Sequence, residues 1–424
     1  MFTAIANAFR VPDLRKKIMF TLFIIVLYRI GAHIPVPGVN AASIQATLDS
    51  LPALGMLNLF SGNALAQFSV FSLGVMPYIT ASIIMQLLQA AIPALERLKK
   101  EGESGQQKIT QYTRYLTIFI ATIEAIGFIG MIFSGAIDPM SAVPRWFTMT
   151  VIVVTLVAGT SLIMWMAELI TQRGIGNGMS LLIFASIISR FPSAVAESLM
   201  FGNADTMGNV AMMTIVIASI LAVIMVVIYI DRGQRRIPVS YAKRIVGRRQ
   251  MGGQSTYIPL KVNGANVVPI IFASAILSIP MQLALVIQAP WFQSFANAVS
   301  QGPLNWLVTF ALIVFFSYFY TALVFNPIEL SDNLRQQGGF IPGMRPGQNT
   351  VTYIATVMNR IVLPGAIFLG TIAVGTSILF SLTSNPLIQQ FGGTSILIMV
   401  GVALETMTQI ESQLKMRHYD GFFK

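Results

Sequence analysis

The chain alternates between apolar blocks of about 20 residues and short polar segments. An α-helix of that length crosses the hydrocarbon core of a bilayer, whereas no soluble core needs so many such blocks. We predict membrane-spanning helices over residues 18–35, 75–93, 115–136, 146–168, 179–196, 210–230, 266–289, 304–327, 358–382 and 394–411. The pattern therefore predicts an all-α polytopic membrane protein with ten transmembrane helices.

The first block resembles a secretory signal peptide, because Arg15, Lys16 and Lys17 precede it. It is longer than the apolar region of a typical signal, it carries Arg29, and it ends in IPVPG rather than in small residues that suit cleavage. We therefore interpret the first block as a span of the mature protein.

Basic residues set the predicted orientation. With both termini in the cytoplasm, all of the 27 Lys and Arg residues except Arg29, Arg145 and Arg190 lie in inner segments or at the inner ends of spans. Cytoplasmic segments of membrane proteins carry such an excess of Lys and Arg. The net charge of +11 is thus explained by topology, and no direct readout of nucleic acid is needed, although a basic loop can still meet an acidic partner.

Ten spans divide into two sets of five. Because five crossings bring the chain to the opposite side of the membrane, the second set starts from that side and is inverted relative to the first. Inverted halves place a pathway at their interface, near the middle of the membrane. The predicted organisation is a cytoplasmic N-terminal segment at 1–17, halves at 18–196 and 210–411, cytoplasmic loops at 231–262 and 327–357, and a cytoplasmic tail at 412–424.

Residues 58–74, NLFSGNALAQFSVFSLG, are too short and too polar for a span that faces lipid. Irregular backbone at membrane depth is tolerated only where protein or a water-filled cavity surrounds it. We predict a short half-helix inside a funnel. The alternative is an interfacial helix that lies on the outer surface.

Two inner loops are longer than topology requires. The first contains RGQRRIPVSYAKRIVGRRQ, in which the alternation of RRIPVSYA predicts a hairpin that stands off the membrane. The second contains GGFIPGMRPGQ, where Gly and Pro predict tight turns around Arg345. Both loops are expected to be docking surfaces. Contact with anionic lipid would explain their charge but not their length.

Candidate chemistry is sparse. Only 10% of the residues are charged, Cys is absent, and neither HExxH nor GxxxxGK[ST] occurs, so we expect no metal, no cofactor and no enzyme activity.

The GIGNG stretch at 174–178 has no strand before it. A tight loop that caps the next helix is favoured over a phosphate cradle.

A transporter for a small solute would place ionisable groups near the middle of the membrane. Arg29, Glu124 and Glu405 are the candidates, but Arg29 and Glu405 lie toward span ends from which both side chains can snorkel. Glu124 lies deeper, where a single carboxyl is more often a packing or interhelical hydrogen-bonding group than a proton relay. The 23 Met residues suit gap-filling between helices better than a binding surface.

Long stretches of the chain resemble the SecY family of protein-conducting channels. They are RIGAHIPVPG, NLFSGNALAQFSVFSLGVMPYITASIIMQLL, KKEGESGQQKITQYTRY, RGIGNGMSLLIF, RGQRRIPVSYAKR, QSTYIPLKV, TALVFNPIELSDNLRQQGGFIPGMRPG and FGGTSILI. The resemblance implies two inverted five-helix halves around an hourglass pore, an outer plug helix, and a lateral gate between helices two and three and helices seven and eight.

The resemblance also assigns roles to residues. The implied apolar pore ring is Val75, Ile79, Met179, Ile183, Ile271 and Ile398, and the family favours Ile where this chain has Val75 and Met179. The implied plug spans about 57–72 and includes Asn58, Phe60, Ser61, Gly62, Phe68 and Phe71. The implied docking residues are Arg235, Arg236, Lys243, Arg244, Arg248, Arg249 and Arg345. Polar Gln86 and Asn263 are expected to weaken the seam of the lateral gate.

The partners that the resemblance implies are the small membrane subunits SecE and SecG, the SecA ATPase, the ribosome, signal-bearing polypeptides and membrane lipid. The implied location is the bacterial cytoplasmic membrane. Two other functions compete with a passive polypeptide channel: a secondary transporter, which predicts a charged site at the midplane, and a membrane enzyme or insertase, which predicts a catalytic or hydrophilic groove. The sequence favours the channel.

Overall fold

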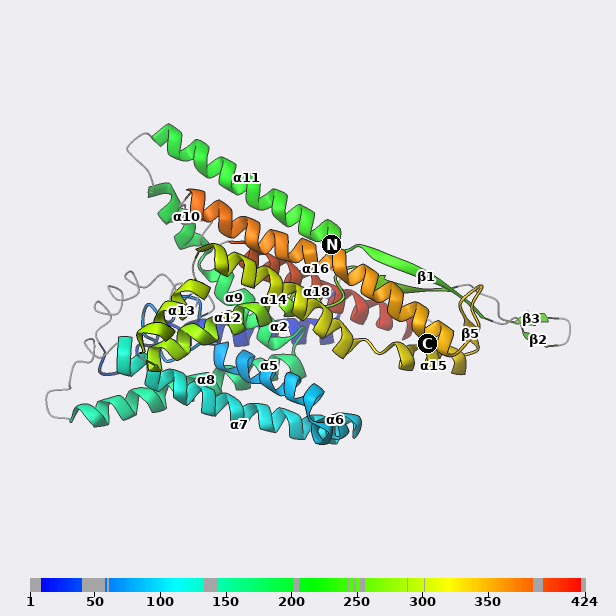
Figure 1. Ribbon diagram of the computed structural model, residues 1–424, viewed down its shortest axis with the longest axis horizontal. Helices are drawn as coiled ribbons and strands as arrows, with labels where there is room; N and C mark the ends of the chain where they lie inside the picture. Colours follow the sequence, from blue (N-terminus) through cyan, green and yellow to red (C-terminus); the bar gives the residue numbers. More distant parts are fainter. Residues whose placement is uncertain are drawn as a thin grey trace.

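The structure is a computed structural model that describes residues 9–39, 58, 61–132, 144–200, 206–241, 244–246, 249–251, 256–287, 289–300, 302–383 and 392–420. Helices dominate it (Figure 1). In chain order they are α2 (Pro12–Gly31), α5 (Met76–Ala91), α6 (Pro93–Lys100), α7 (Glu103–Gly127), the π-helix η1 (Phe128–Ile132), α8 (Arg145–Arg173), α9 (Gly178–Ser189), α10 (Phe191–Met200), α11 (Thr206–Asp231), α12 (Val268–Val286), α13 (Pro290–Ser300), α14 (Gly302–Val324), α15 (Pro327–Gln336), α16 (Gln348–Thr383) and α18 (Gly393–Asp420).

Seven helices of the described chain are long and apolar enough to cross a membrane. An eighth crossing results if α5 and α6, which meet at an angle of 99°, count as one span. Helix α2 also lies on a predicted span but carries Arg15, Lys16 and Lys17 in its first half, and the apolar stretch of α12, Val268–Ala284, is shorter than the seven candidate spans. The structure thus confirms a helical protein with many apolar spans.

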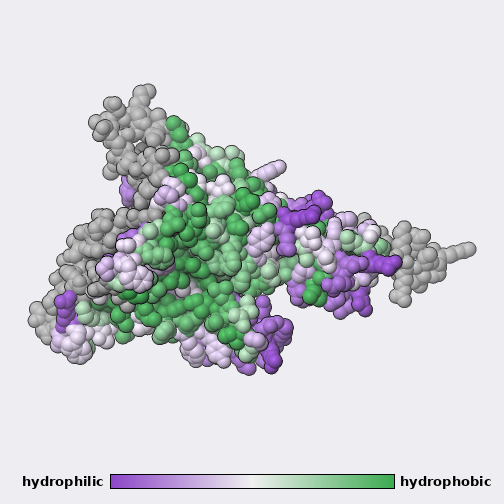
Figure 2. Space-filling view, in the orientation of Figure 1, coloured by the Kyte–Doolittle hydropathy of each residue, from purple (hydrophilic) through white to green (hydrophobic). Residues whose placement is uncertain are grey.

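The surface shows an apolar belt. Figure 2 shows hydrophobic side chains across the middle of the visible face and hydrophilic side chains at the end that carries α6 and the β-strands. Large apolar side chains are exposed on several helices: Phe119 of α7, Met225 of α11 and Leu307 of α14 are each more than 60% exposed. An apolar surface this broad on a protein in water would drive aggregation, so the belt indicates contact with lipid.

Several helices extend beyond the predicted spans. Helix α7 begins at Glu103, although the apolar block begins near residue 115, and α18 continues to Asp420. Hydropathy marks only the part of a helix that crosses the hydrocarbon core of the membrane. The backbone hydrogen bonds of the helix can continue into polar sequence beyond that core. Helix α5 does stop where it was predicted to stop, because Pro93 cannot continue the helix.

The two long polar loops, after α11 and after α15, contribute strands to one sheet. Strand β1 (Gln234–Tyr241) pairs antiparallel with β4 (Thr256–Lys261), which confirms the predicted hairpin. Strand β1 also pairs with β5 (Gly339–Phe340) of the second loop. A shorter pair, β2 (Arg244–Val246) and β3 (Arg249–Met251), extends the hairpin away from the helices (Figure 1).

A small apolar core fixes the sheet to the helices. Ile237, Val239 and Leu260 of the hairpin pack with Ile341 of the second loop and Ile354 of α16, and all five are buried. Alternating residues of β1 therefore point into this core, as the polar and apolar alternation of the sequence predicted. The sheet and the inner end of α16 form a single packed unit.

Candidate functional site

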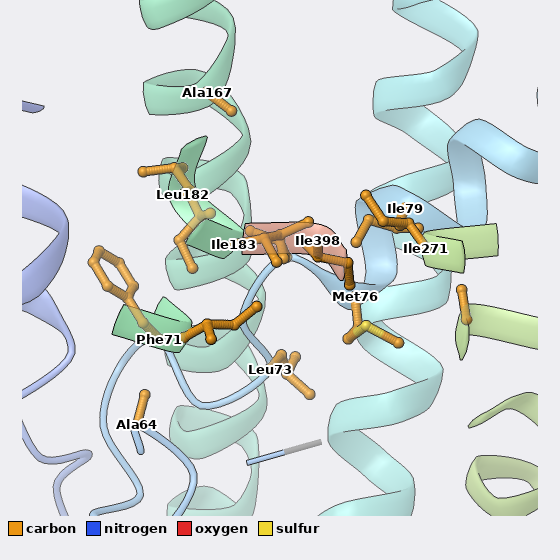
Figure 3. Packing of buried hydrophobic residues seen from close by; sticks show 14 of the residues in the cluster. Ala64, Phe71, Leu73, Met76, Ile79, Ala167, Leu182, Ile183, Ile271 and Ile398 are labelled. Atoms are coloured by element: carbon orange, nitrogen blue, oxygen red, sulfur yellow. The ribbon is translucent and has the colours of Figure 1, made fainter. Parts of the chain in front are cut away.

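Four aliphatic side chains from four helices meet inside the bundle. Ile79 of α5, Ile183 of α9, Ile271 of α12 and Ile398 of α18 lie close together in Figure 3. Their exposed fractions are 5%, 1%, 7% and 0%. The side chains thus pack against neighbours and fill the space between the four helices.

Local sequence places these isoleucines near helix starts. Pro77 and Pro269 stand in the first turns of α5 and α12, where proline needs no backbone N–H partner. The side chain of Asn177 caps α9 by accepting hydrogen bonds from the N–H groups of Met179 and Ser180, at 3.1 and 3.3 Å. This cap confirms the tight capping loop predicted for GIGNG.

The structure places the six predicted ring residues in the apolar interior and at the cavity beside it. Ile79, Met179, Ile183 and Ile271 line a cavity of about 350 Å³. Val75 and Ile398 are fully buried and belong to the same apolar cluster, without lining the cavity. The structure therefore brings the six residues into one region, and the role of the ring as a pore remains a prediction.

The lining of the cavity includes Gln172, near the C-terminal end of α8, and Asn177, which caps α9. Its walls carry both aromatic and polar groups. They include Tyr78, Gln86, Thr110, Thr171, Gln172 and Tyr320. One wall also holds Glu168, whose carboxylate accepts two hydrogen bonds from the guanidinium of Arg114. Arg114 Nε donates to Oε1 at 2.9 Å, and Arg114 Nη2 donates to Oε2 at 2.5 Å. Residues 54 positions apart form this pair, and sequence reasoning missed it.

Residues 61–75, which we call the plug segment, lie beside the four isoleucines (Figure 3). Figure 3 shows Leu73, Phe71 and Ala64 of this segment below the isoleucines. Residues 58 and 61 are helical, whereas residues 62–75 run through successive turns with a bridge at Ser69, so no helix continues over that part of the predicted plug. Positive φ angles at Gly62, Asn63 and Phe68 interrupt any regular helix. Phe60 and residue 57, also assigned to the plug, lie outside the described residues.

Polar side chains of the plug segment close on its own backbone. Ser61 Oγ donates to the carbonyl of Asn58 at 3.0 Å, and Ser72 Oγ donates to the carbonyl of Ala64 at 3.0 Å. The carboxamide of Asn58 donates to Asn63 Oδ1 and accepts from the N–H of Ala66, each at 3.2 Å. The segment satisfies its own polar groups, which allows it to be buried at membrane depth.

The C-terminal part of α2 and the residues that follow it hold the plug segment. The N–H of Val36 donates to the carbonyl of Phe68, and the N–H of Val70 donates to the carbonyl of Ile34, both at 2.9 Å. The ring of Tyr28 stacks on Phe71 with centroids 5.7 Å apart. A Cβ on Gly159 of α8 would lie 1.9 Å from the carbonyl oxygen of Val70, so only glycine fits there.

Arg29 does not snorkel outward as the sequence suggested. Its Nη1 donates to the carbonyl of Gly62 at 3.0 Å, so it is a contact between α2 and the plug segment. Glu124 is buried as expected, but its Oε1 has no hydrogen-bond partner. Of the two roles that the sequence left open for Glu124, packing or an interhelical hydrogen bond, the described structure does not show the hydrogen bond at Oε1. Glu405 is partly buried in α18.

The two predicted gate residues make separate contacts. Gln86 Nε2 donates to Ser82 Oγ within α5 at 3.2 Å and lines the cavity. Asn263 Nδ2 donates to Asp231 Oδ1 at 3.0 Å and so joins the end of α11 to the segment before α12. Among the described residues, Gln86 and Asn263 do not hydrogen-bond to each other, and their role in a gate remains a prediction.

The predicted docking residues lie on the joined sheet and beside it. Arg235 and Arg236 are exposed on β1, and the guanidinium of Arg236 lies 4.7 Å from the centre of the Tyr257 ring. Arg345 is exposed on a turn between Gly343 and Gly347, both with positive φ. Arg244 and Arg249 belong to β2 and β3, but only their backbone is described. Lys243 and Arg248 lie outside the described residues.

Known proteins share this architecture. The model of the SecY family matches residues 69–407. The protein translocase subunit SecY of Streptomyces scabiei is 51% identical over 444 residues, which cover 100% of both chains. That of Mycobacterium tuberculosis strain H37Rv is 46% identical over 447 residues, again over 100% of both chains.

Two solved structures share the fold at low identity. One, described as a protein conducting channel, has a TM-score of 0.64 at 17% identity and covers 93% of this chain and 91% of its own. Sec61 in the canine ribosome-channel complex from the endoplasmic reticulum has a TM-score of 0.59 at 16% identity, with the same coverage. With full-length relatives at this identity and a family match over most of its length, the chain belongs to the SecY family.

Proposed function

We infer that this chain is the pore-forming subunit of a protein-conducting channel. It passes unfolded secretory polypeptides across the membrane and releases signal or transmembrane segments sideways into lipid. The observation that carries the inference is the constriction of Ile79, Ile183, Ile271 and Ile398, which lies between a cavity on one side and the plug segment on the other. The chain is therefore a channel rather than an enzyme.

An aliphatic constriction suits this task for two physical reasons. Its side chains cannot replace the hydrogen bonds of water, so a narrow constriction of this kind dewets and resists ions. Contacts between aliphatic atoms are weak and non-directional, about 0.1 to 0.2 kcal/mol for each atom pair. A passing polypeptide of any sequence is thus not held for long.

The proposed channel has ten spans in two inverted halves. Helices α2, α5, α7, α8 and α9 form the first half, and α11, α12, α14, α16 and α18 form the second. Both termini face the cytoplasm, because that orientation places the basic loops inside. The membrane is the bacterial cytoplasmic membrane, as expected from the bacterial relatives.

The channel needs an external source of energy. We propose that SecA or the ribosome supplies it by binding the sheet of β1, β4 and β5 together with the turn around Arg345, and that SecE and SecG complete the complex. One structural neighbour is named as part of a ribosome-channel complex, which supports a ribosome as partner. The exposed basic side chains of this surface suit an acidic partner.

A solute transporter is less well supported. Its site would need several ionisable groups together at the midplane. In the described chain, Glu168 is paired with Arg114, and Glu124 has no ion-pair partner. The family match also supports the translocation channel.

Site-specific crosslinking tests the function. The chain has no Cys, so single cysteines can be introduced without background. In reconstituted vesicles with SecA, Ile271→Cys should crosslink to a cysteine in the mature part of an arrested substrate, and Gln86→Cys should crosslink to a cysteine in its signal sequence. Phe119→Cys on the exposed face of α7 is the control that should crosslink to neither. The pore assignment is wrong if Ile271→Cys never contacts the substrate.

A charge reversal at Arg345 tests the docking surface. A guanidinium presents several donors in a fixed plane, so we expect directional contacts to carboxylate or carbonyl groups of the partner. Arg345→Glu should lower SecA-driven translocation by at least about tenfold, and Arg345→Lys should recover only part of it. Translocation of a signal-bearing substrate is the measurement, with Arg360→Glu on α16 as the control. Unchanged translocation by Arg345→Glu would exclude the proposed contact.

A further inference from the structure

One charged side chain holds the backbone of the plug segment. Arg29 Nη1 donates to the carbonyl of Gly62 at 3.0 Å. The other contacts of the plug segment with α2 and the residues after it are backbone hydrogen bonds of Ile34 and Val36 and apolar packing of Gly31 and Tyr28 on Phe71, and Ser61 and Ser72 bond to backbone carbonyls of Asn58 and Ala64. Among the hydrogen bonds of the described residues, a charged side chain from outside the plug segment therefore bonds to it in one case, that of Arg29.

The contact lies beside the constriction. Gly62 has a φ of +65°, and a Cβ added to it would lie 2.8 Å from Arg29 Nη1 and 3.0 Å from the Cα of Ser186. Ser186 Oγ is 2.7 Å from the hydroxyl of Tyr28, the residue before Arg29. Ser186 also lies about one turn after Ile183 in α9. Gly62 is thus enclosed between α2 and the helix that carries a constriction residue.

We propose that Arg29 is the positioning residue that keeps the plug segment seated under the constriction in the resting channel. A hydrogen bond from a charged donor is about twice as strong as one between neutral groups. Once the plug leaves, the guanidinium is exposed to the aqueous outer funnel and regains water as a partner. The contact therefore favours the closed state without making release irreversible. This proposal rests on the proposed channel function.

A disulfide that fastens the plug by another route provides the decisive test. Pro35 and Ser69 face each other across an antiparallel bridge. Opposed residues in such pairs have Cα atoms about 4.5 to 5.5 Å apart, a distance that a disulfide spans. Oxidised Pro35→Cys/Ser69→Cys should fix the plug to the end of α2, and reduction should free it.

Resting ion conductance in planar bilayers is the measurement. Arg29→Gln should raise it by about tenfold or more, a change that corresponds to roughly 1.4 kcal/mol in the balance between seated and released plug. Arg29→Lys should give a smaller rise, because it keeps the charge but not the planar donor. Arg173→Gln, the same substitution at an exposed position on α8, should leave conductance unchanged.

Combining Arg29→Gln with the oxidised disulfide should restore the low conductance of the parent, and reduction should bring the leak back. A merely structural role for Arg29 predicts a leak that the disulfide does not correct. That outcome, or an Arg29→Gln channel as ion-tight as the parent, overturns the proposal. Translocation by the parent is measured alongside. Its absence would contradict the channel function but would leave the comparison of conductances valid.

Discussion

Replacing Ile79 and Ile183 together by serine is expected to raise the resting ion conductance of the reconstituted channel by at least about tenfold. Both side chains are buried at the constriction, with exposed fractions of 5% and 1%. Serine removes aliphatic volume and adds a hydroxyl that binds water. A constriction that was dry then becomes hydrated, and ions can follow the water.

Two controls separate polarity from size and from general damage. Alanine is close to serine in volume but has no hydroxyl, so Ile79→Ala/Ile183→Ala should leak less than the serine pair. Ile126→Ser/Ile367→Ser places hydroxyls on exposed positions of α7 and α16 and should leave the conductance unchanged. Single-channel recording in planar bilayers distinguishes these outcomes. A serine pair that is as ion-tight as the parent would show that another barrier seals the channel.

A single methyl group at position 159 is expected to have an effect of similar size. A Cβ on Gly159 would lie 1.9 Å from the carbonyl oxygen of Val70 and 2.8 Å from its carbonyl carbon. These are backbone atoms that a side-chain rotation cannot move away. Since Val70 is also bonded to Ile34 through its N–H, Gly159→Ala must shift either α8 or the plug segment.

We expect Gly159→Ala to destabilise the closed protein by about 2 to 3 kcal/mol, the cost of overpacking a filled interior, and to raise the resting conductance. Gly375→Ala in α16 is the matched control, because a Cβ there has no neighbour within 4 Å. In a helix interior that substitution should stabilise by about 0.5 to 1 kcal/mol. Thermal unfolding in detergent, read beside conductance, compares the two. Equal effects of both substitutions would refute the close approach of α8 to the plug segment.

The sequence was most informative about features that depend on nearby residues. Apolar length located the spans, because hydropathy is a property of each segment alone. Alternation in RRIPVSYA located strand β1 for the same reason. Helix ends were harder to locate. The polar start of α7 and the polar end of α18 continue in helical hydrogen bonding beyond the lipid, where hydropathy carries no signal.

Features that depend on distant residues were missed. The pairing of β1 with β5 joins segments about 100 residues apart and has no local signature beyond two residues of strand. The contacts of Arg114 with Glu168 and of Arg29 with Gly62 likewise follow from how helices pack. The turns over residues 62–75 also involve a distant contact, because the carbonyl of Phe68, a residue with a positive φ that its side chain disfavours, accepts a hydrogen bond from Val36.

The internal hydrogen bonds of the plug segment have a consequence for how fast the channel recloses. Ser72 donates to the carbonyl of Ala64, and Ser61 donates to that of Asn58 just before the segment, so local hydrogen bonds hold part of its shape. The carbonyls of Gly62 and Phe68 are instead bonded by Arg29 and Val36, outside the segment. If the plug segment moves as proposed, we expect it to keep its local turns while a substrate passes. Return would then need only the outer contacts to re-form, which would shorten the time during which ions can leak.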